Sequence, residues 1–160
     1  MTWEARVIWE GKLLHIHTTE AAGMRMDARS KALCIAGVGI DGDRYASGKG
    51  YYSVKPDIRE VTLIESETLA ALRRDHGIDL AVDEHRRNLT TIGVPLNHLV
   101  GRCFSVGSVV LEGGRLNTPC RYLETLIDKP VFKMLLHRSG LNCRITQGGL
   151  IEPGDLIKPL

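Results

Sequence analysis

Short apolar stretches separated by glycine turns run along most of the chain and predict a mainly β structure. Trp3–Trp9 and Leu13–His17 mix apolar with polar residues as half-buried strands do, and Glu10-Gly11-Lys12 between them predicts a hairpin turn. The same pattern predicts further strands at Arg59–Ile64, at Leu141–Gln147, and on either side of Gly107-Ser108 within Ser105–Leu111.

Helical spacing is confined to a few short segments. In Glu65–His76, Leu69 and Leu72 are three residues apart, acidic residues come early, and Gly77 follows a basic end, which predicts a helix. Pro130–Arg138 starts with a proline, which suits a first helical turn, and carries apolar residues at helical spacing. Regular alternation of strands with long helices is absent, so the predicted fold is mainly β (α+β) with a few short helices.

Length and charge indicate a single domain over residues 1–160. The formal net charge of +2 is too small for general binding to nucleic acid or to a membrane surface. The first residues lack a cationic segment followed by an apolar one, and no apolar run approaches the roughly 18 residues of a membrane span. We therefore expect a cytoplasmic protein with no nucleic-acid or membrane partner, in which any basic site is local.

The cysteines stand far apart, without the close pairs that zinc ribbons and thioredoxin-like sites need. A reducing cytosol then predicts four free thiols. Cys34, Cys103 and Cys143 lie in apolar segments and are expected to be buried. The histidines form no recognised metal motif, and no serine lies in a nucleophile-elbow sequence.

The stretch from Gly37 to Gly50, GVGIDGDRYASGKG, contains the letters of a G-x-G-x-x-G fingerprint. Its context excludes a dinucleotide site, because Gly48 and Gly50 would interrupt the helix that must follow. Asp43 at a required glycine excludes a Walker loop, and Tyr45 at a ligand position argues against a calcium loop. The stretch is therefore interpreted as a flexible loop whose charged residues need be no more than a polar connection. These residues are Asp41, Asp43, Arg44 and Lys49.

Two adjacent arginines, Arg86 and Arg87, lie in the segment EHRRN. A planar guanidinium donates paired hydrogen bonds to phosphate or carboxylate oxygens. If the segment is extended, the two side chains point to opposite faces, so at most one would line a given pocket directly. Solvated charges ahead of a strand are the alternative interpretation.

Cys120 has a different setting from the other cysteines, in the segment NTPCRYLE. Pro119 ends the preceding strand, and the apolar residues Tyr122 and Leu123 predict a helical turn just after it. A helix N-terminus and the neighbouring Arg121 would both favour a thiolate, the form that attacks electrophiles and binds soft metals. A small buried apolar residue is the alternative.

Five segments, in order, resemble the MOSC family, which is named after the C-terminal domain of molybdenum cofactor sulfurases. They are GIDGDR (39–44), REVTLIESE (59–67), RRNLTTIGVPLNHLVGRCFSVGSVVLEG (86–113), PCRYLE (119–124) and GLIEPGDLI (149–157). The resemblance covers residues 35–157 and points to the small stand-alone members. It departs from the family at Ile40-Asp41, where Leu-Glu is more common, and is less clear before residue 35.

The resemblance implies a β-barrel and a site for the molybdenum cofactor, a pterin dithiolene that holds molybdenum and carries a terminal phosphate. It implies that Cys120 is either a molybdenum ligand or a carrier of persulfide sulfur. We hypothesise that arginines bind the anionic cofactor and that Asp43 either binds pterin N–H groups or holds an arginine in place. The predicted cofactor-binding residues are Asp43, Arg44, Arg59, Arg86, Arg87 and Asn88.

Some relatives reduce N-hydroxylated small molecules at molybdenum, with electrons from separate flavin or iron–sulfur partners. This chain has no flavin motif and no clustered cysteines, so that reaction would need a separate electron donor. Pyridoxal phosphate, which large sulfurases bind in another domain, is not expected in so short a chain. Two alternatives stay open: a non-redox carrier of sulfur or cofactor that uses Cys120 with a sulfurtransferase partner, and a non-catalytic domain that binds an anionic ligand. An apolar edge strand is also compatible with a homodimer.

Overall fold

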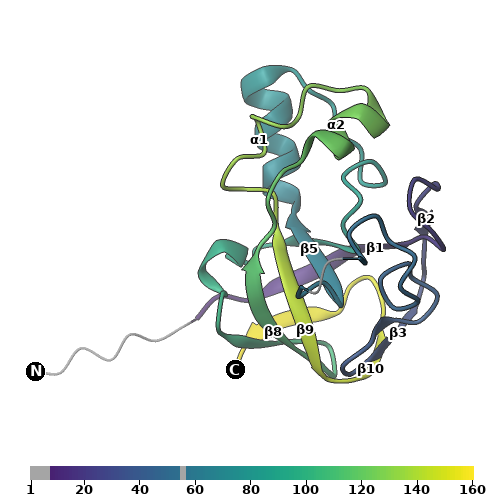
Figure 1. Ribbon diagram of the computed structural model, residues 1–160. Coiled ribbons are helices and arrows are strands. Elements are labelled where there is room, and N and C mark those ends of the chain that lie inside the picture. The colour runs from purple at the N-terminus through teal and green to yellow at the C-terminus, as the bar shows by residue number, and fades with distance from the viewer. Residues whose placement is uncertain (1–7, 55–56) are drawn as a thin grey trace, which may run out of the picture.

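The computed structural model describes residues 8–54 and 57–160 and contains a closed β-barrel (Figure 1). Its seven strands are, in spatial order, β11 (Leu156–Pro159), β7 (Cys103–Val106), β8 (Val109–Leu116), β9 (Leu141–Gln147), β5 (Val61–Glu65), β6 (Leu89–Ile92) and β1 (Gly11–Thr18). The ring closes where β1 pairs antiparallel with β11, with Gly11 opposite Ile157. Only β5 and β6 run parallel in this ring, so the barrel is mixed, and the predicted mainly β fold is confirmed.

Smaller elements flank the barrel. They are a three-stranded sheet in the order β10 (Gly149–Ile151), β3 (Ala32–Ile35) and β4 (Gly39–Ile40), the short β2 (Asp27–Ala28), the 3-10 helix η1 (Leu96–His98), and the helices α1 (Ser66–His76) and α2 (Arg121–Ile127). The helices α1 and α2 lie together above one end of the barrel (Figure 1). Within residues 8–54 and 57–160, no helix has the length and apolar character needed to cross a bilayer.

Two clusters of buried apolar side chains stabilise the barrel and the helices above it. The larger one fills the barrel with strand side chains such as Leu13, Leu63 and Phe104, all of which are fully buried. The smaller one joins Leu72 of α1 to Leu123 of α2. Because α2 starts directly after Cys120, this packing also positions the thiol of the candidate site.

The predicted helix at residues 65–76 is confirmed as α1. Leu72 faces the core, and the basic residues of the last turn precede Gly77, which adopts a left-handed backbone with φ 64°. The Gly77 N–H donates to the Arg73 carbonyl and the Ile78 N–H to the Leu72 carbonyl, which satisfies acceptors that the helix end would leave unpaired. The helix connects β5 to the parallel strand β6, as a crossover between parallel strands requires.

Glu65, just before α1, is expected to make stability depend on pH. Burial, followed by the charge of Glu67, raises the pKa of Glu65 from 4.5 to about 7. Between these values the folded protein holds a proton that the unfolded chain has released, so stability falls as the pH rises through this range. In Glu65→Gln this fall should be absent. Between pH 4.5 and pH 8, the free energy of unfolding of the variant should therefore rise by about 1 kcal/mol relative to that of the wild type, a figure reduced for the partial exposure of the side chain.

Urea unfolding at the two pH values measures this effect. Glu20→Gln, at an exposed position, is the matched control and should follow the wild type at both pH values. A difference between Glu65→Gln and wild type that stays constant with pH would contradict the prediction.

The predicted turn at Glu10-Gly11-Lys12 is wrong, because Gly11 and Lys12 open strand β1. A Cβ atom at Gly11 would lie 2.5 Å from the carbonyl oxygen of Ile92, so this glycine permits close strand approach and not chain reversal. Of the predicted strand Trp3–Trp9, residues 3–7 lie outside the described residues, and residues 8–9 form no strand. The remaining predicted strands are confirmed with slightly shifted bounds, including the hairpin β7–β8 that turns at Gly107-Ser108.

The predicted helix at Pro130–Arg138 is also wrong, because the segment forms consecutive turns. The N–H of Leu135 bonds to the carbonyl of Val131 at helical spacing, but Arg138 bonds three residues back, and His137 has a left-handed backbone with φ 64°. Val131 and Leu135 are both buried against the helices. Their spacing therefore indicated burial correctly without indicating a helix.

All four cysteines are free, as predicted. Cys34 and Cys143 are buried, and burial raises the pKa of the Cys34 thiol to about 12. Cys103 is exposed, contrary to the prediction, because alternation along β7 places Phe104 inside the barrel and Cys103 outside.

Candidate functional site

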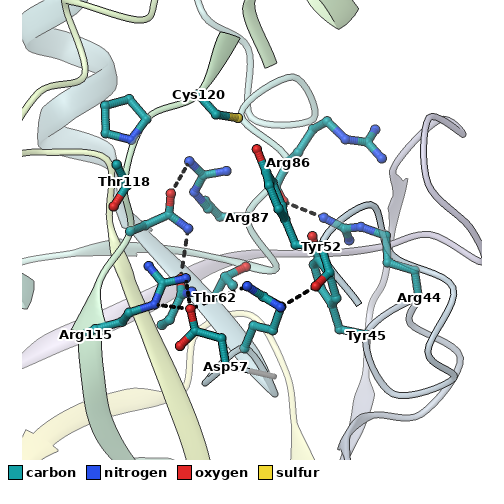
Figure 2. A pocket seen from close by; sticks show the side chains of 14 residues that line it. Arg44, Tyr45, Tyr52, Asp57, Thr62, Arg86, Arg87, Arg115, Thr118 and Cys120 are labelled. Carbon is teal, nitrogen blue, oxygen red and sulfur yellow. Dashed lines mark hydrogen bonds and ion pairs between the residues drawn. The ribbon is translucent and has the colours of Figure 1, made fainter. Parts of the chain in front are cut away.

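A cavity of about 480 Å³ opens beside the N-terminus of α2 (Figure 2). Its walls come from the loop after β4, the approach to β5, the segment before β6, and the connection between β8 and α2. Segments far apart in sequence therefore meet here. The charged and thiol side chains that line it are Arg44, Asp57, Arg59, Arg86, Arg87, Arg115 and Cys120.

Positive charge dominates the cavity, since five guanidiniums share it with one carboxylate, Asp57. The Asp57 carboxylate lies 2.7 Å from the guanidinium of Arg115 and 3.4 Å from that of Arg59. The hydrogen bond from Arg115 lowers the pKa of Asp57, which therefore stays ionised. The excess positive charge that remains suits an anionic ligand.

Arg87 is held rigidly by neutral acceptors. Its guanidinium donates to the Asn117 side chain at 2.7 Å, to the Ser139 carbonyl at 3.0 Å and hydroxyl at 2.9 Å, and to the His85 carbonyl at 3.0 Å. Burial lowers the pKa of Arg87 to about 10, which still leaves a cation at neutral pH. Burial and then the Arg87 charge lower the pKa of His85, and its neutral ring accepts the backbone N–H of Arg87.

Arg86 and Arg87 both line the cavity, so the prediction that at most one would do so is wrong. That prediction assumed an extended chain, whereas Arg86 has a left-handed backbone with φ 63°. The turn at Arg86 removes the alternation of side chains that an extended strand would impose. Arg86 donates through Nη1 to the Met24 carbonyl at 2.7 Å, and its Nη2 is buried without a hydrogen-bond partner.

Asp43 and Arg44 are buried, so this part of the predicted flexible loop is anchored. Asp43 Oδ1 accepts hydrogen bonds from the Thr19 N–H and from Arg44 Nη1, both at 3.2 Å. Arg44 also donates to the Arg86 carbonyl at 3.0 Å and lies over the Tyr45 ring, 4.5 Å from its centroid. Asp43 does not line the cavity, and its contacts favour the second of its two proposed roles, holding an arginine.

Asn88 and Arg59 act at different depths of the wall. Asn88 is fully buried behind the cavity, where its side-chain oxygen accepts from the Thr62 N–H at 3.1 Å and its amide donates to the His17 carbonyl at 3.2 Å. Arg59 lines the cavity, donates to the Tyr52 carbonyl, and lies 5.6 Å from that ring's centroid. Asn88 therefore contacts the supporting strand, and Arg59 holds an aromatic wall.

Cys120 is the N-cap of α2, in agreement with the predicted helical start, and is partly exposed to the cavity. Figure 2 shows its sulfur directed toward Tyr52 and Arg87. Burial, followed by the nearby thiol of Cys120, raises the pKa of Tyr52, so its hydroxyl stays neutral. Arg121 instead lies over the Phe132 ring at 5.2 Å, so the positive charge facing Cys120 across the cavity is that of Arg87.

Sequence reasoning missed several lining residues. Tyr52 comes from a Tyr-Tyr pair next to the glycine loop, and Arg115 and Asn117 precede the Pro-Cys motif by only a few positions. Aromatic and donor side chains so close to candidate segments were a usable signal. No group of three or more His, Cys, Asp or Glu side chains is placed to hold a metal ion in the described part of the chain.

A family model described as "MOSC domain" matches residues 52–158. Among solved structures, the YuaD protein from Bacillus subtilis matches with TM-score 0.78 and 18% identity over 94% of this chain and 97% of that chain. YiiM from Geobacillus stearothermophilus matches with TM-score 0.72 and 15% identity (94% and 75% covered), and YiiM from Escherichia coli with 0.66 and 15% (93% and 69%). At these identities the structures share the fold. A comparison with curated proteins found no match.

Proposed function

The chain belongs to the MOSC domain family, and from this membership we propose that its arginine-rich cavity binds the molybdenum cofactor and supports reduction of N-hydroxylated small molecules. The observation that carries the proposal is the convergence of five guanidiniums and one carboxylate beside the thiol of Cys120. The guanidiniums suit a terminal phosphate, and the thiol suits a soft metal.

The residues present fit such a group. The cavity volume of about 480 Å³ lies within the usual range for small-molecule sites. Arg87 donates its hydrogen bonds to neutral acceptors, so no carboxylate neutralises its charge, which remains available to an anion. No cluster of protein side chains in the described residues completes a metal site around Cys120, which fits a metal whose other ligands come from the dithiolene of the cofactor.

Each residue then has a defined part. Cys120 would hold molybdenum through its thiolate, and Arg87 would stabilise negative charge on that sulfur. Tyr52 lines the cavity beside the sulfur, and Arg59 and Arg115 would bind the anionic end of the cofactor from the opposite wall. When bound, the molybdenum centre supplies the two-electron redox chemistry that removes oxygen from nitrogen. The electrons would come from a separate flavin or iron–sulfur protein.

Sulfur transfer is the second candidate function, because partial exposure of Cys120 leaves its sulfur open to a partner's persulfide. In that case the same cavity would stabilise the anionic persulfide through Arg87. No redox partner would be required, and no metal would accompany the protein.

The proposal is tested by the molybdenum-to-protein ratio of protein produced in a host that makes the cofactor. Wild type should carry close to one molybdenum, and Cys120→Ala should lose about 90% or more of it, since the variant lacks a direct ligand. Cys103→Ala, which removes an exposed thiol outside the cavity, is the matched control and should load as the wild type does.

Other outcomes are equally clear. Well-folded wild type without molybdenum would contradict the proposal, and an extra sulfur atom on Cys120 in intact-protein mass spectrometry would then favour sulfur transfer. Neither metal nor persulfide would favour a non-catalytic anion-binding domain.

A further inference from the structure

Two histidines of strand β1, His15 and His17, line a second cavity, of about 540 Å³. Ile16 between them packs inside the barrel, so both imidazoles point outward from the same strand face, with ring centroids 6.3 Å apart. The other walls come from the end of β2 with the segment after it, and from Val82 and Pro153. Within the described ranges, no residue lines both this cavity and the arginine-rich one, so the two are separate.

His17 has coordinating capacity that the fold leaves unused. Only 4% of the residue is exposed, and its Nδ1 has no hydrogen-bond partner among the described residues. Buried polar atoms normally have such a partner, so an unpaired ring nitrogen in a residue that lines a cavity points to a ligand. His15 is exposed, and its side chain can therefore turn toward that ligand.

A third histidine, His85, is near this pair but is fully engaged. Its Nδ1 accepts the backbone N–H of Arg87 at 2.9 Å, so its Nε2 carries the proton and donates to the Thr90 hydroxyl at 2.9 Å. Thr90 is the cross-strand partner of His15. The cavity therefore offers two imidazoles and not three, in agreement with the finding that no larger group of metal-binding side chains occurs in the described residues.

The charges around the pair favour a cation. Burial lowers the pKa of His17, so its ring is neutral at neutral pH, whereas the nearby carboxylates of Asp83 and Asp27 act on that pKa in the opposite direction. Arg29 also lines the cavity. Its Nη1, however, lies 3.9 Å from the position that a Cβ atom would take at Gly42, in the loop after β4 and outside the cavity walls. Two carboxylates thus act near the imidazoles, while the guanidinium is directed toward the loop.

We propose that His15 and His17 chelate a divalent first-row transition metal ion, such as Zn²⁺, Ni²⁺ or Cu²⁺, at this outer cavity. Neutral imidazole suits all three ions. Two imidazoles on one tetrahedral zinc, with Zn–N of about 2.0–2.1 Å, hold their ring centroids roughly 5 Å apart. The present separation is 6.3 Å, so a small rotation of the exposed His15 brings both rings to one ion. Water completes the coordination.

The experiment is a titration of the full chain with Ni²⁺, followed by backbone amide NMR. Paramagnetic Ni²⁺ broadens the signals of nearby residues, so the position of the ion is read directly. The broadening should be saturable and centred on residues 14–18 of β1 and their partners in β2 and β6. His15→Ala, at an exposed position, should bind about 10-fold or more weakly, because the second imidazole of the chelate is lost.

His98→Ala is the matched control, since it removes an exposed histidine that lines a different cavity, and it should bind Ni²⁺ as the wild type does. Broadening centred on Cys103 or Cys120, or equal affinity in His15→Ala and wild type, would overturn the inference. Pulsed EPR of the equimolar Cu²⁺ complex counts the bound imidazoles. It should find two in wild type and one in His15→Ala, and a single imidazole in wild type would overturn the inference.

This site does not depend on the proposed function, and variants separate the two. His15→Ala should keep the wild-type molybdenum-to-protein ratio, while Cys120→Ala should keep the wild-type affinity for Ni²⁺ at β1. Loss of that Ni²⁺ binding from Cys120→Ala would overturn the inference. Wild type that binds Ni²⁺ at β1 but carries no molybdenum would contradict the proposed function and support the histidine site.

Discussion

Replacing Arg87 with glutamine is expected to lower the free energy of unfolding by about 3–5 kcal/mol and to strip the protein of cofactor. The guanidinium makes four hydrogen bonds, and the acceptors on Asn117, Ser139 and His85 would all lose their donor in a buried setting. The charge that faces Cys120 disappears in the same step. Urea unfolding and the molybdenum-to-protein ratio measure the two losses.

Arg115→Gln is the matched control for stability, because it makes the same chemical change at the rim of the same cavity. Arg115 is partly exposed, with 35% of its side chain accessible, and so is its ion-pair partner Asp57, with 32% accessible. Its loss should cost no more than about 1 kcal/mol. If Arg87→Gln unfolds within 1 kcal/mol of this control, Arg87 is not a structural centre of the site, and its proposed part in cofactor binding would depend on the metal ratio alone.

Gly140→Ala is expected to destabilise the protein by about 3 kcal/mol or more. Its φ is 109°, and a Cβ atom there would lie 2.0 Å from the carbonyl oxygen of Leu63 in β5. The backbone must shift, since no side chain can rotate away. The neighbouring Ser139 and Asn117 both bind Arg87, and the Gly140 carbonyl accepts the Asn117 N–H at 2.8 Å, so cofactor loading should fall as well.

Gly154→Ala separates backbone strain from this steric contact. Gly154 has a comparable φ of 97°, but no atom lies within 4 Å of the added Cβ. We expect a loss of only about 1 kcal/mol, from strain alone. Equal losses for the two variants in urea unfolding would show that contact with Leu63 contributes nothing.

Much of the barrel follows from local signals. Strands such as β9 and the hairpin between β7 and β8 were predicted because alternation and a glycine turn act over a few residues. Helix α1 was predicted because its dipole-matched charges and Gly77 are local as well. The predictions failed where a contact with a residue distant in sequence determines the local conformation: Gly11 lies against Ile92, and Val131 is buried against the helices.

The candidate site shows the same division. The functional groups of the site could be predicted from the sequence, because a thiol and a guanidinium keep their chemical properties wherever they lie in the fold. The orientation of the Arg86 side chain could not be predicted, because its left-handed backbone is accompanied by contacts with Arg44 and Met24, which are distant in sequence. Arg115 and Tyr52 could be noticed only as neighbours of candidate segments in the sequence, and their position beside Cys120 depends on the tertiary structure.

The sequence by itself determined a mainly β chain, a short helix with its end, and the residue types able to bind an anion and a soft metal. The tertiary structure decided which of them meet: Arg87 faces Cys120, while Arg121 lies over Phe132. The physical reason is range. Backbone preference and side-chain alternation act between neighbours in the chain, whereas the cavity forms because barrel closure and helix packing bring together residues from about 44 to 142.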